Sequence, residues 1–312
     1  MYCMEFYINS FKKEGDLMEI YGKPFNPWGN NAPFIEKYAT AAMLYCSGTS
    51  KVLDTFDSYP RYLNYTFGIT DPIAYHKKLI SEGYYTKAST EDILEIFRVA
   101  DLKEILIQNN LPAKGRRPAL IEAILKNINP TKLNLGEFYT RSELGESYLS
   151  KYSYVMTLRN YSIKPCEYAE YEDVHPGLTT DEIILGILHN RYTESRLAED
   201  YGIARNALYE LSIFYEQKNA FEKALYKLIC VLYFDTSGYS NKYRDSLERI
   251  ILAPGILDLI CKYQEFYSSK MIDNCFLEYA LPEHYLTKNQ FEKLIKKIFN
   301  NCSVEDIDLK EL

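Results

Sequence analysis

Three cationic residues, Lys114, Arg116 and Arg117, flank Gly115 directly before a segment with a strongly apolar helical pattern. Pro118 suits the first turn of that helix, because its ring fixes the backbone angle and the first turn needs no donor from it. The backbone N–H groups of a first turn have no acceptor within the helix and carry about half a positive charge. A glycine lets an anion approach the backbone without a Cβ in the way. These residues therefore indicate contact with a phosphate group.

Two short amphipathic helices are expected to position this basic loop. The apolar residues of the first helix, at i, i+3 and i+4 spacing, are Leu102, Ile105 and Leu106. The residues of the second helix that are expected to face the first are Leu120, Ile121, Ile124, Leu125 and Ile128. Pro112 and Gly115 predict a tight connection, with Leu111 sealing it. We expect a helical hairpin with the basic loop at one corner.

This stretch, at about residues 94–128, resembles the SAP motif, a helix–extended loop–helix module associated with binding DNA, often at A/T-rich regions. The segments that carry the resemblance are 97–103, 111–112, 115–117 and 120–122. The resemblance implies that Gly115 shapes the loop and that the DNA backbone is met by Arg116, Arg117, Lys103 and Lys114. It also implies a core made of Leu102, Ile105, Leu106, Leu111, Leu120 and Ile124.

The sequence departs from the family pattern at two positions. Ala119 stands where the family usually has an acidic residue, and Ala123 where it often has a basic one. The second change removes a cation from the expected contact face. Residues 90–128 carry six Lys/Arg and six Asp/Glu, so the positive charge is concentrated at the loop. Three or four phosphate contacts give a salt slope of only about −3 to −4, so weak binding is expected without a second element or copy.

The remainder of the chain predicts a mainly α protein with three parts. Residues 1–60 indicate an irregular aromatic-rich arm with a short helix at 34–45, and residues 61–150 a domain that contains the SAP-like hairpin. A β-prone piece at 138–140, followed by a helix to 149, resembles the end of a winged-helix domain. Residues 151–312 predict a helical bundle or short α-solenoid, in which 208–236 resembles one tetratricopeptide repeat.

Catalytic and cofactor motifs are absent from the sequence. The seven cysteines are scattered without a C-x-x-C pair, and the four histidines have no partner at metal-ligand spacing, so no metal site or cofactor is expected. Glycine-rich phosphate loops, H-E-x-x-H and G-x-S-x-G do not occur. No stretch approaches the roughly 20 apolar residues that span a bilayer. We expect a cytoplasmic protein that is neither an enzyme nor bound to a membrane.

Thirty tyrosines in 312 residues allow two interpretations. They reflect the base composition of an A/T-rich genome, or they line a binding surface, since tyrosine offers a flat apolar face and one hydroxyl.

Two functional hypotheses follow from the sequence. In the first, the SAP-like hairpin tethers the protein to double-stranded DNA and the helical domain recruits an unknown protein partner. In the second, the protein is a helical interaction scaffold, and the hairpin docks protein rather than nucleic acid. The net charge of −7 favours the second hypothesis, and the basic loop favours the first. Burial of Arg116 and Arg117 against the C-terminal domain would count against the first.

Overall fold

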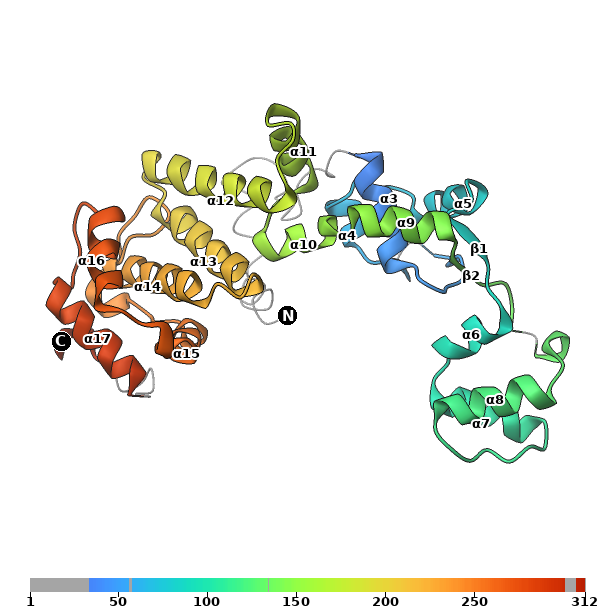
Figure 1. Cartoon of the computed structure of the whole chain (residues 1–312). Helices are drawn as coiled ribbons and strands as arrows, with labels where there is room; N and C mark the ends of the chain where they lie inside the picture. The colour runs from blue at the N-terminus through green and yellow to red at the C-terminus, as the bar shows by residue number, and fades with distance from the viewer. Residues whose placement is uncertain (1–33, 56–57, 134, 301–306, 312) are drawn as a thin grey trace, which may run out of the picture. The chain divides into compact units, whose positions relative to one another are not determined.

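The computed structural model describes residues 34–55, 58–133, 135–300 and 307–311, and the chain forms two compact units. Unit 1 comprises residues 1–156 and unit 2 residues 157–312. Both units are mainly helical, and the sheet found within the described residues has two strands (Figure 1). The predicted mainly α class is confirmed. The boundary predicted at 150/151 falls inside helix α9 (Glu143–Tyr152), and most of the predicted arm, including Trp28, lies outside the described residues.

Unit 1 is built around α3 (Glu36–Cys46), the short helix that the sequence predicted at 34–45. Residues 38–44 are all buried, because α3 contacts α9, α4 and α5. The remaining helices of this scaffold are α4 (Tyr62–Tyr65), α5 (Pro72–Ser81) and α10 (Tyr154–Thr157), which spans the division between the units. Asp71 caps α5 by accepting a hydrogen bond from the Ala74 N–H at 2.9 Å.

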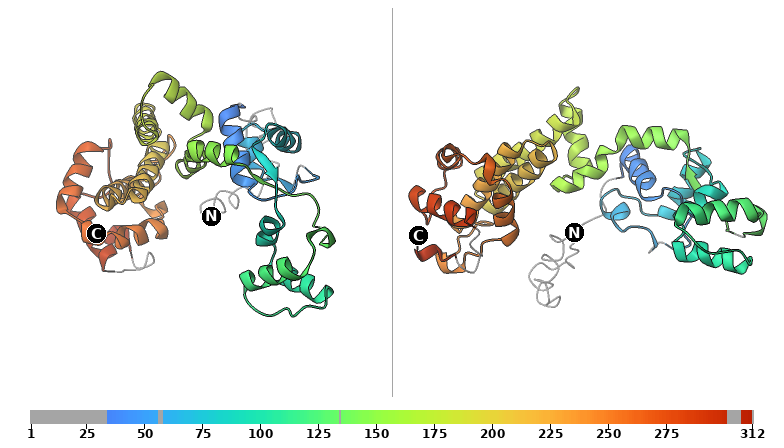
Figure 2. Two further views of the ribbon diagram at one scale, coloured as in Figure 1. Left: turned by 45° about the vertical axis from the view of Figure 1, so that its right-hand side comes forward. Right: turned by 60° about the horizontal axis from the view of Figure 1, so that its bottom comes forward.

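A pair of three-residue strands forms the base of an insertion. Strand β1 (Tyr85–Lys87) pairs antiparallel with β2 (Tyr139–Arg141), and the Ala88 N–H extends the ladder by donating to the Phe138 carbonyl at 2.9 Å. Residues 88–138 therefore leave the scaffold and return to it at one place, and we call them the insertion lobe (Figure 2). The β-prone piece at 138–140 is thus one half of this sheet. The winged-helix resemblance remains a prediction.

The insertion lobe contains α6 (Thr90–Ile96), α7 (Val99–Gln108), α8 (Arg117–Asn127) and the 3₁₀ turn η2 (Pro130–Lys132). Ser89 and Asp92 form a capping box at the start of α6. The buried core of the lobe comprises Leu94, Leu102, Leu106, Leu120, Ile121, Ile124 and Ile128. Ile105 and Leu111 pack against it, so all six predicted core residues are where the sequence placed them.

Two details of the predicted hairpin are wrong. The start of α8 lies beside the end of α6, because the Arg117 guanidinium donates to the Glu95 carbonyl. The connection therefore runs back along α7 instead of turning tightly, and α7 and α8 run in the same direction (Figure 1). Ten helical residues rise about 15 Å, which residues 109–116 can span when extended. The second correction concerns Leu125, which was expected to face α7. It is 36% exposed, because it lies about 100° round α8 from Ile124, at the edge of the buried face.

Unit 2 is a succession of packed helices. Its long helices are α12 (Thr180–Leu197), α13 (Tyr201–Gln217) and α14 (Phe221–Ser237). The shorter helices are α11 (Pro165–Val174), α15 (Pro254–Lys262), α16 (Ser269–Glu278) and α17 (Lys288–Phe299). The 3₁₀ turns are η3 (Leu158–Tyr161), η4 (Leu247–Arg249), η5 (Gln264–Phe266) and η7 (Leu309–Glu311). No described helix is long and apolar enough to cross a bilayer. The tetratricopeptide resemblance remains a prediction.

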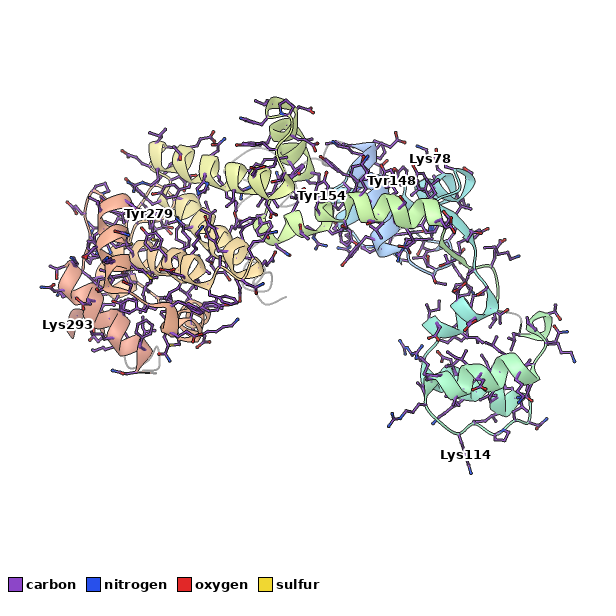
Figure 3. All side chains as sticks on the ribbon, viewed as in Figure 1. Lys78, Lys114, Tyr148, Tyr154, Tyr279 and Lys293 are labelled. Atoms are coloured by element: carbon purple, nitrogen blue, oxygen red, sulfur yellow. The ribbon has the colours of Figure 1, made fainter. Side chains whose placement is uncertain are left out.

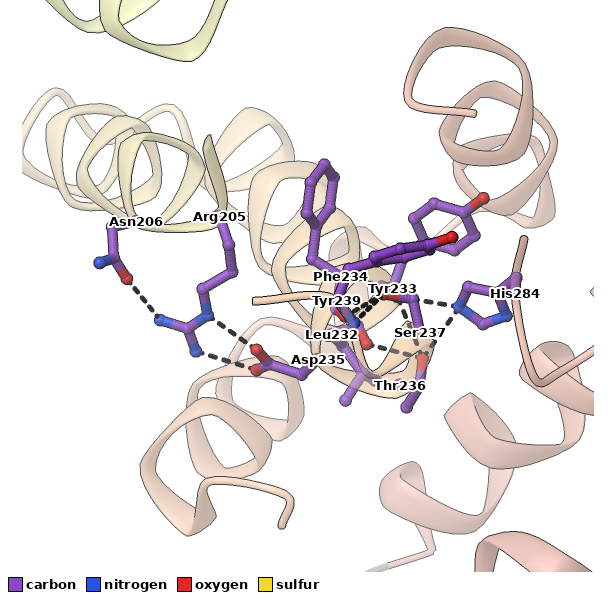
Figure 4. Close-up of polar contacts among 10 residues, drawn as sticks. All are labelled: Arg205, Asn206, Leu232, Tyr233, Phe234, Asp235, Thr236, Ser237, Tyr239 and His284. Carbon is purple, nitrogen blue, oxygen red and sulfur yellow. Dashed lines mark hydrogen bonds and ion pairs between the residues drawn. The ribbon is translucent and has the colours of Figure 1, made fainter. Parts of the chain in front are cut away.

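Helix α14 holds unit 2 together through polar as well as apolar contacts. Arg205 of α13 pairs with Asp235 through two bonds, Nε–Oδ1 at 2.8 Å and Nη2–Oδ2 at 2.9 Å (Figure 4). The His284 ring lies 2.8 Å by Nε2 from the Tyr233 carbonyl oxygen and stacks on the Tyr233 ring at 4.4 Å. His284 therefore fastens the chain between α16 and α17 to the last turns of α14, a structural role.

The scaffold of unit 1 buries a histidine completely. His76 on α5 is 0% exposed, its Nδ1 lies 2.9 Å from the Tyr59 hydroxyl, and its Nε2 has no hydrogen-bond partner among the described residues. Burial lowers the pKa of His76 from 6.5 to about 4. The unfolded chain therefore binds a proton between these pH values that the folded chain does not.

This burial predicts acid sensitivity of unit 1. The His76 contribution to the free energy of unfolding is fully present above pH 6.5 and is lost as the pH falls to about 4, by about 3 kcal/mol. Denaturant unfolding at pH 7 and pH 4.5 should show a smaller pH dependence for His76→Gln than for the wild type. His175→Gln is the control for removing one imidazole from the chain, since His175 is exposed and lies in unit 2. Equal pH dependence in His76→Gln and wild type would contradict the assignment.

Candidate nucleic-acid interface

The five candidate residues all lie in the insertion lobe. Lys103 is on α7, and the other four form the end of the connection and the start of α8. Lys114, Gly115, Arg116 and Lys103 are exposed, whereas Arg117 is half-buried. Lys114 projects outward from the connection (Figure 3). The described residues pair no acidic side chain with these cations, so the loop cations remain available to an anion.

Gly115 has the backbone conformation that the loop requires. Its φ is +117°, a value that residues with a Cβ rarely adopt. A Cβ added there would also lie 3.1 Å from the Cβ of Ala119. The loop-shaping role that the family resemblance implied for Gly115 therefore has a geometric cause in this chain.

The start of α8 lacks a capping side chain. Arg116 is the N-cap residue, and the first helical hydrogen bond runs from the Leu120 N–H to the Arg116 carbonyl at 3.2 Å. Pro118 in the first turn has no N–H group. The partial positive charge of the first turn therefore adds to the charge of the exposed Arg116 at the same end of the helix.

Arg117 differs from Arg116 in its surroundings. Its Nη1 donates to the Glu95 carbonyl at the end of α6, which fixes the start of α8 against α6. A guanidinium has five N–H donors, so others stay available. Arg117 thus positions the basic loop, while Arg116 and Lys114 point away from the lobe core.

One cation of the interface was not identified from the sequence. Arg98 is exposed and is the N-cap residue of α7, and its backbone N–H donates to Asp101 Oδ2 at 3.0 Å. Because α7 and α8 run in the same direction, Arg98 and Arg116 stand at the same end of the lobe. An antiparallel hairpin would have placed Arg98 at the opposite end from Arg116. The signal in the sequence was an arginine immediately before each of the two helices.

Lys103 is separated from that end of the lobe. It lies five residues after Arg98, about 7 Å further along the helix axis. Its neighbours on the same exposed stripe of α7 are Val99, 39% exposed, and Ile107, 63% exposed. The structure therefore brings Arg98, Arg116 and Arg117 together, and it places Lys103 on an adjoining, partly apolar face.

The part of the chain that the structure describes has no candidate metal site. No group of three or more His, Cys, Asp or Glu side chains is placed to hold a metal ion there. The cysteines at 46, 166, 230, 261 and 275 are free thiols.

Comparison with known families identifies the lobe. The family model of the SAP domain matches residues 97–129, which cover α7, the extended connection and α8. The chain therefore contains a SAP domain, and the resemblance inferred from the residues is confirmed. No curated protein sequence matches the chain.

The geometry at Gly115 predicts a local loss of stability. Gly115→Ala should destabilise the insertion lobe by about 1–3 kcal/mol, because alanine cannot adopt the observed backbone angle without strain. Amide hydrogen exchange should rise in α7 and α8 and stay constant in α12 to α14. Gly255→Ala is the control, since the added Cβ has nothing within 4 Å and φ there is ordinary. Unchanged exchange in α7 and α8 of Gly115→Ala would contradict this prediction.

Proposed function

We propose that the protein is a non-enzymatic DNA-binding protein, whose SAP domain holds the backbone of a duplex while the helical unit binds a protein partner. The SAP domain supports nucleic-acid binding in general, since this module is associated with DNA. One observation carries the proposal. At one end of the insertion lobe, Arg98, Arg116 and Arg117 lie at the N-termini of two helices that run in the same direction.

The arrangement suits phosphate contact rather than base recognition. Helix N-termini and guanidinium groups bind phosphate oxygens, which fix the position of a protein on DNA without reading its sequence. Apart from Arg117, the residues that follow the two N-cap arginines are small or apolar, namely Val99, Ala100, Pro118 and Ala119. They offer the bases no hydrogen-bond donors or acceptors from their side chains. Any preference for A/T-rich DNA would then come from the shape and stiffness of the duplex.

The charge of the two units supports a local interface. Unit 1 is neutral overall, and unit 2 carries the whole net charge of −7. A duplex is therefore drawn to the basic end of the lobe and repelled by unit 2. With Lys114 included, four cations allow a salt slope of about −4 at most, which corresponds to modest affinity for one lobe. The scattered free cysteines support the further proposal of a cytoplasmic location.

A second candidate function rests on the outer face of α7. Ile107 is 63% exposed and Val99 39% exposed, on one stripe with Lys103 between them. Such a stripe suits protein docking by the lobe, which is the scaffold hypothesis without DNA. Absence of DNA binding by the wild type at low salt would favour this second function.

DNA binding is tested by its salt dependence. Fluorescence anisotropy of a labelled duplex, over salt concentrations of about 50–200 mM, should give a slope for the wild type of about −3 to −4. Arg116→Ala and Arg98→Ala should each reduce the magnitude of the slope by about 1, because each removes one phosphate contact. The loss should be equal for mixed and A/T-rich duplexes.

Lys126→Ala is the matched control. Lys126 is an exposed cation near the end of α8, about 14 Å along the helix from its start. Its removal should leave the slope unchanged. If Arg116→Ala and Lys126→Ala weaken DNA binding equally, the contact is a general charge effect and the proposed interface is wrong.

A further inference from the structure

Unit 2 contains a half-buried ammonium group that has no carboxylate ion-pair partner among the described residues. Lys227 on α14 donates a hydrogen bond to the Tyr279 hydroxyl, and its Nζ lies over the rings of Tyr226 and Tyr279, 5.2 and 5.0 Å from their centroids. The ion pairs formed by the described residues do not include Lys227. Exposed lysines of the same unit do form them: Lys218 pairs with Asp181 at 2.6 Å and Lys262 with Glu216 at 2.9 Å.

The surroundings of Lys227 favour an added anion. Burial lowers the pKa of the Lys227 ammonium, because water is removed from it, and the charge of the nearby Glu278 carboxylate opposes only part of this effect. An ammonium group has three donors, and the Tyr279 hydroxyl takes one of them. An anion placed on the remaining donors would compensate for the lost hydration.

Aromatic rings form the walls around this ammonium group. Tyr192 on α12 contacts Tyr279 with ring centroids 5.4 Å apart, and Tyr226 contacts Tyr279 at 6.1 Å. His189, exposed and one turn before Tyr192 on α12, lies close enough to Lys227 for the ammonium to lower its pKa, in addition to the larger effect of burial. We call these five residues, His189, Tyr192, Tyr226, Lys227 and Tyr279, the Lys227 seat. Figure 3 labels Tyr279, which directly follows α16.

The charges near the seat limit the kind of anion. Glu278 accepts a hydrogen bond from the Tyr226 hydroxyl at 2.8 Å, so one carboxylate already lies at the edge of the seat. Unit 2 as a whole carries −7, which repels a polyanion such as DNA. A single carboxylate has a smaller repulsion to overcome, and an apolar group beside it gains contact with the tyrosine rings.

We propose that the Lys227 seat binds one carboxylate of a partner protein segment, with an adjacent apolar side chain packed on Tyr192 and Tyr226. The proposal rests on the partner-binding half of the proposed function and is independent of the DNA interface. The partner segment would carry an acidic residue or a chain terminus next to an apolar side chain. It would bind across α12, α14 and the end of α16.

The test uses a small probe with this chemistry. N-acetyl-phenylalanine carries a carboxylate beside an apolar ring, and N-acetyl-phenylalanine amide is the same molecule without the charge. Titration of the full chain, followed by NMR of ¹³C-labelled tyrosine rings, should shift Tyr226 and Tyr279 with the acid and not with the amide. Lys227→Met should weaken the binding at least about tenfold, as expected for loss of a charge-assisted hydrogen bond.

Two further variants test the role of charge independently of Lys227→Met. Glu278→Gln should strengthen binding of the acid several-fold, because it removes the carboxylate that repels the probe; this outcome does not depend on the folding of Lys227→Met. Lys262→Met is the control, since Lys262 is an exposed lysine already paired with Glu216. Both Lys227→Met and Lys262→Met should leave DNA affinity unchanged, which separates failure of this proposal from failure of the DNA interface.

Three results would overturn the proposal. Equal ring shifts with acid and amide would show that charge plays no part. Unchanged affinity in both Lys227→Met and Glu278→Gln would show that the ammonium group is not the contact. Ring shifts on adding duplex DNA, together with DNA affinity lost in Lys227→Met, would reassign the seat to nucleic acid.

Discussion

The direction in which α8 runs depends on where its first residue is held. The Arg117 guanidinium bonds the Glu95 carbonyl, and the core residues Leu94, Leu102 and Leu120 pack together behind this bond. The connection from α7 must then cover the length of that helix before α8 begins. As a result the two helix N-termini share one end of the lobe, and their partial positive charges add up there. A reversed α8 would leave one arginine at each end and no concentrated positive field.

The features that could be predicted from the sequence are those set by residues close together in the chain. The i, i+3 and i+4 spacing of Leu102, Ile105 and Leu106 and the position of Pro118 in the first turn of α8 each depend on one or two helical turns. Backbone geometry alone determines which of these residues face one another. The SAP core and the basic loop can therefore be predicted from the sequence alone.

The features that could not be predicted depend on contacts between distant residues. Tyr85 pairs with Arg141 across 56 positions, and strands of three residues carry too little alternation to indicate a partner. The direction of α8 follows from a side-chain bond that no spacing rule encodes, so the role of Arg98 was missed. The Lys227 seat combines residues of α12, α14 and the end of α16, three elements whose packing the sequence pattern leaves open.

The insertion of the lobe between β1 and β2 also has a mechanical consequence. Both covalent ends of the lobe emerge side by side from the same two strands, Tyr85–Lys87 and Tyr139–Arg141. A pulling force applied at the basic end is shared by two parallel lengths of polypeptide. Each pulls on its own strand in the same direction, so the hydrogen bonds between β1 and β2 need not break under the load. The scaffold of unit 1 can thus resist tension at the basic end of the lobe through covalent backbone, and the sheet acts only to keep the two segments together.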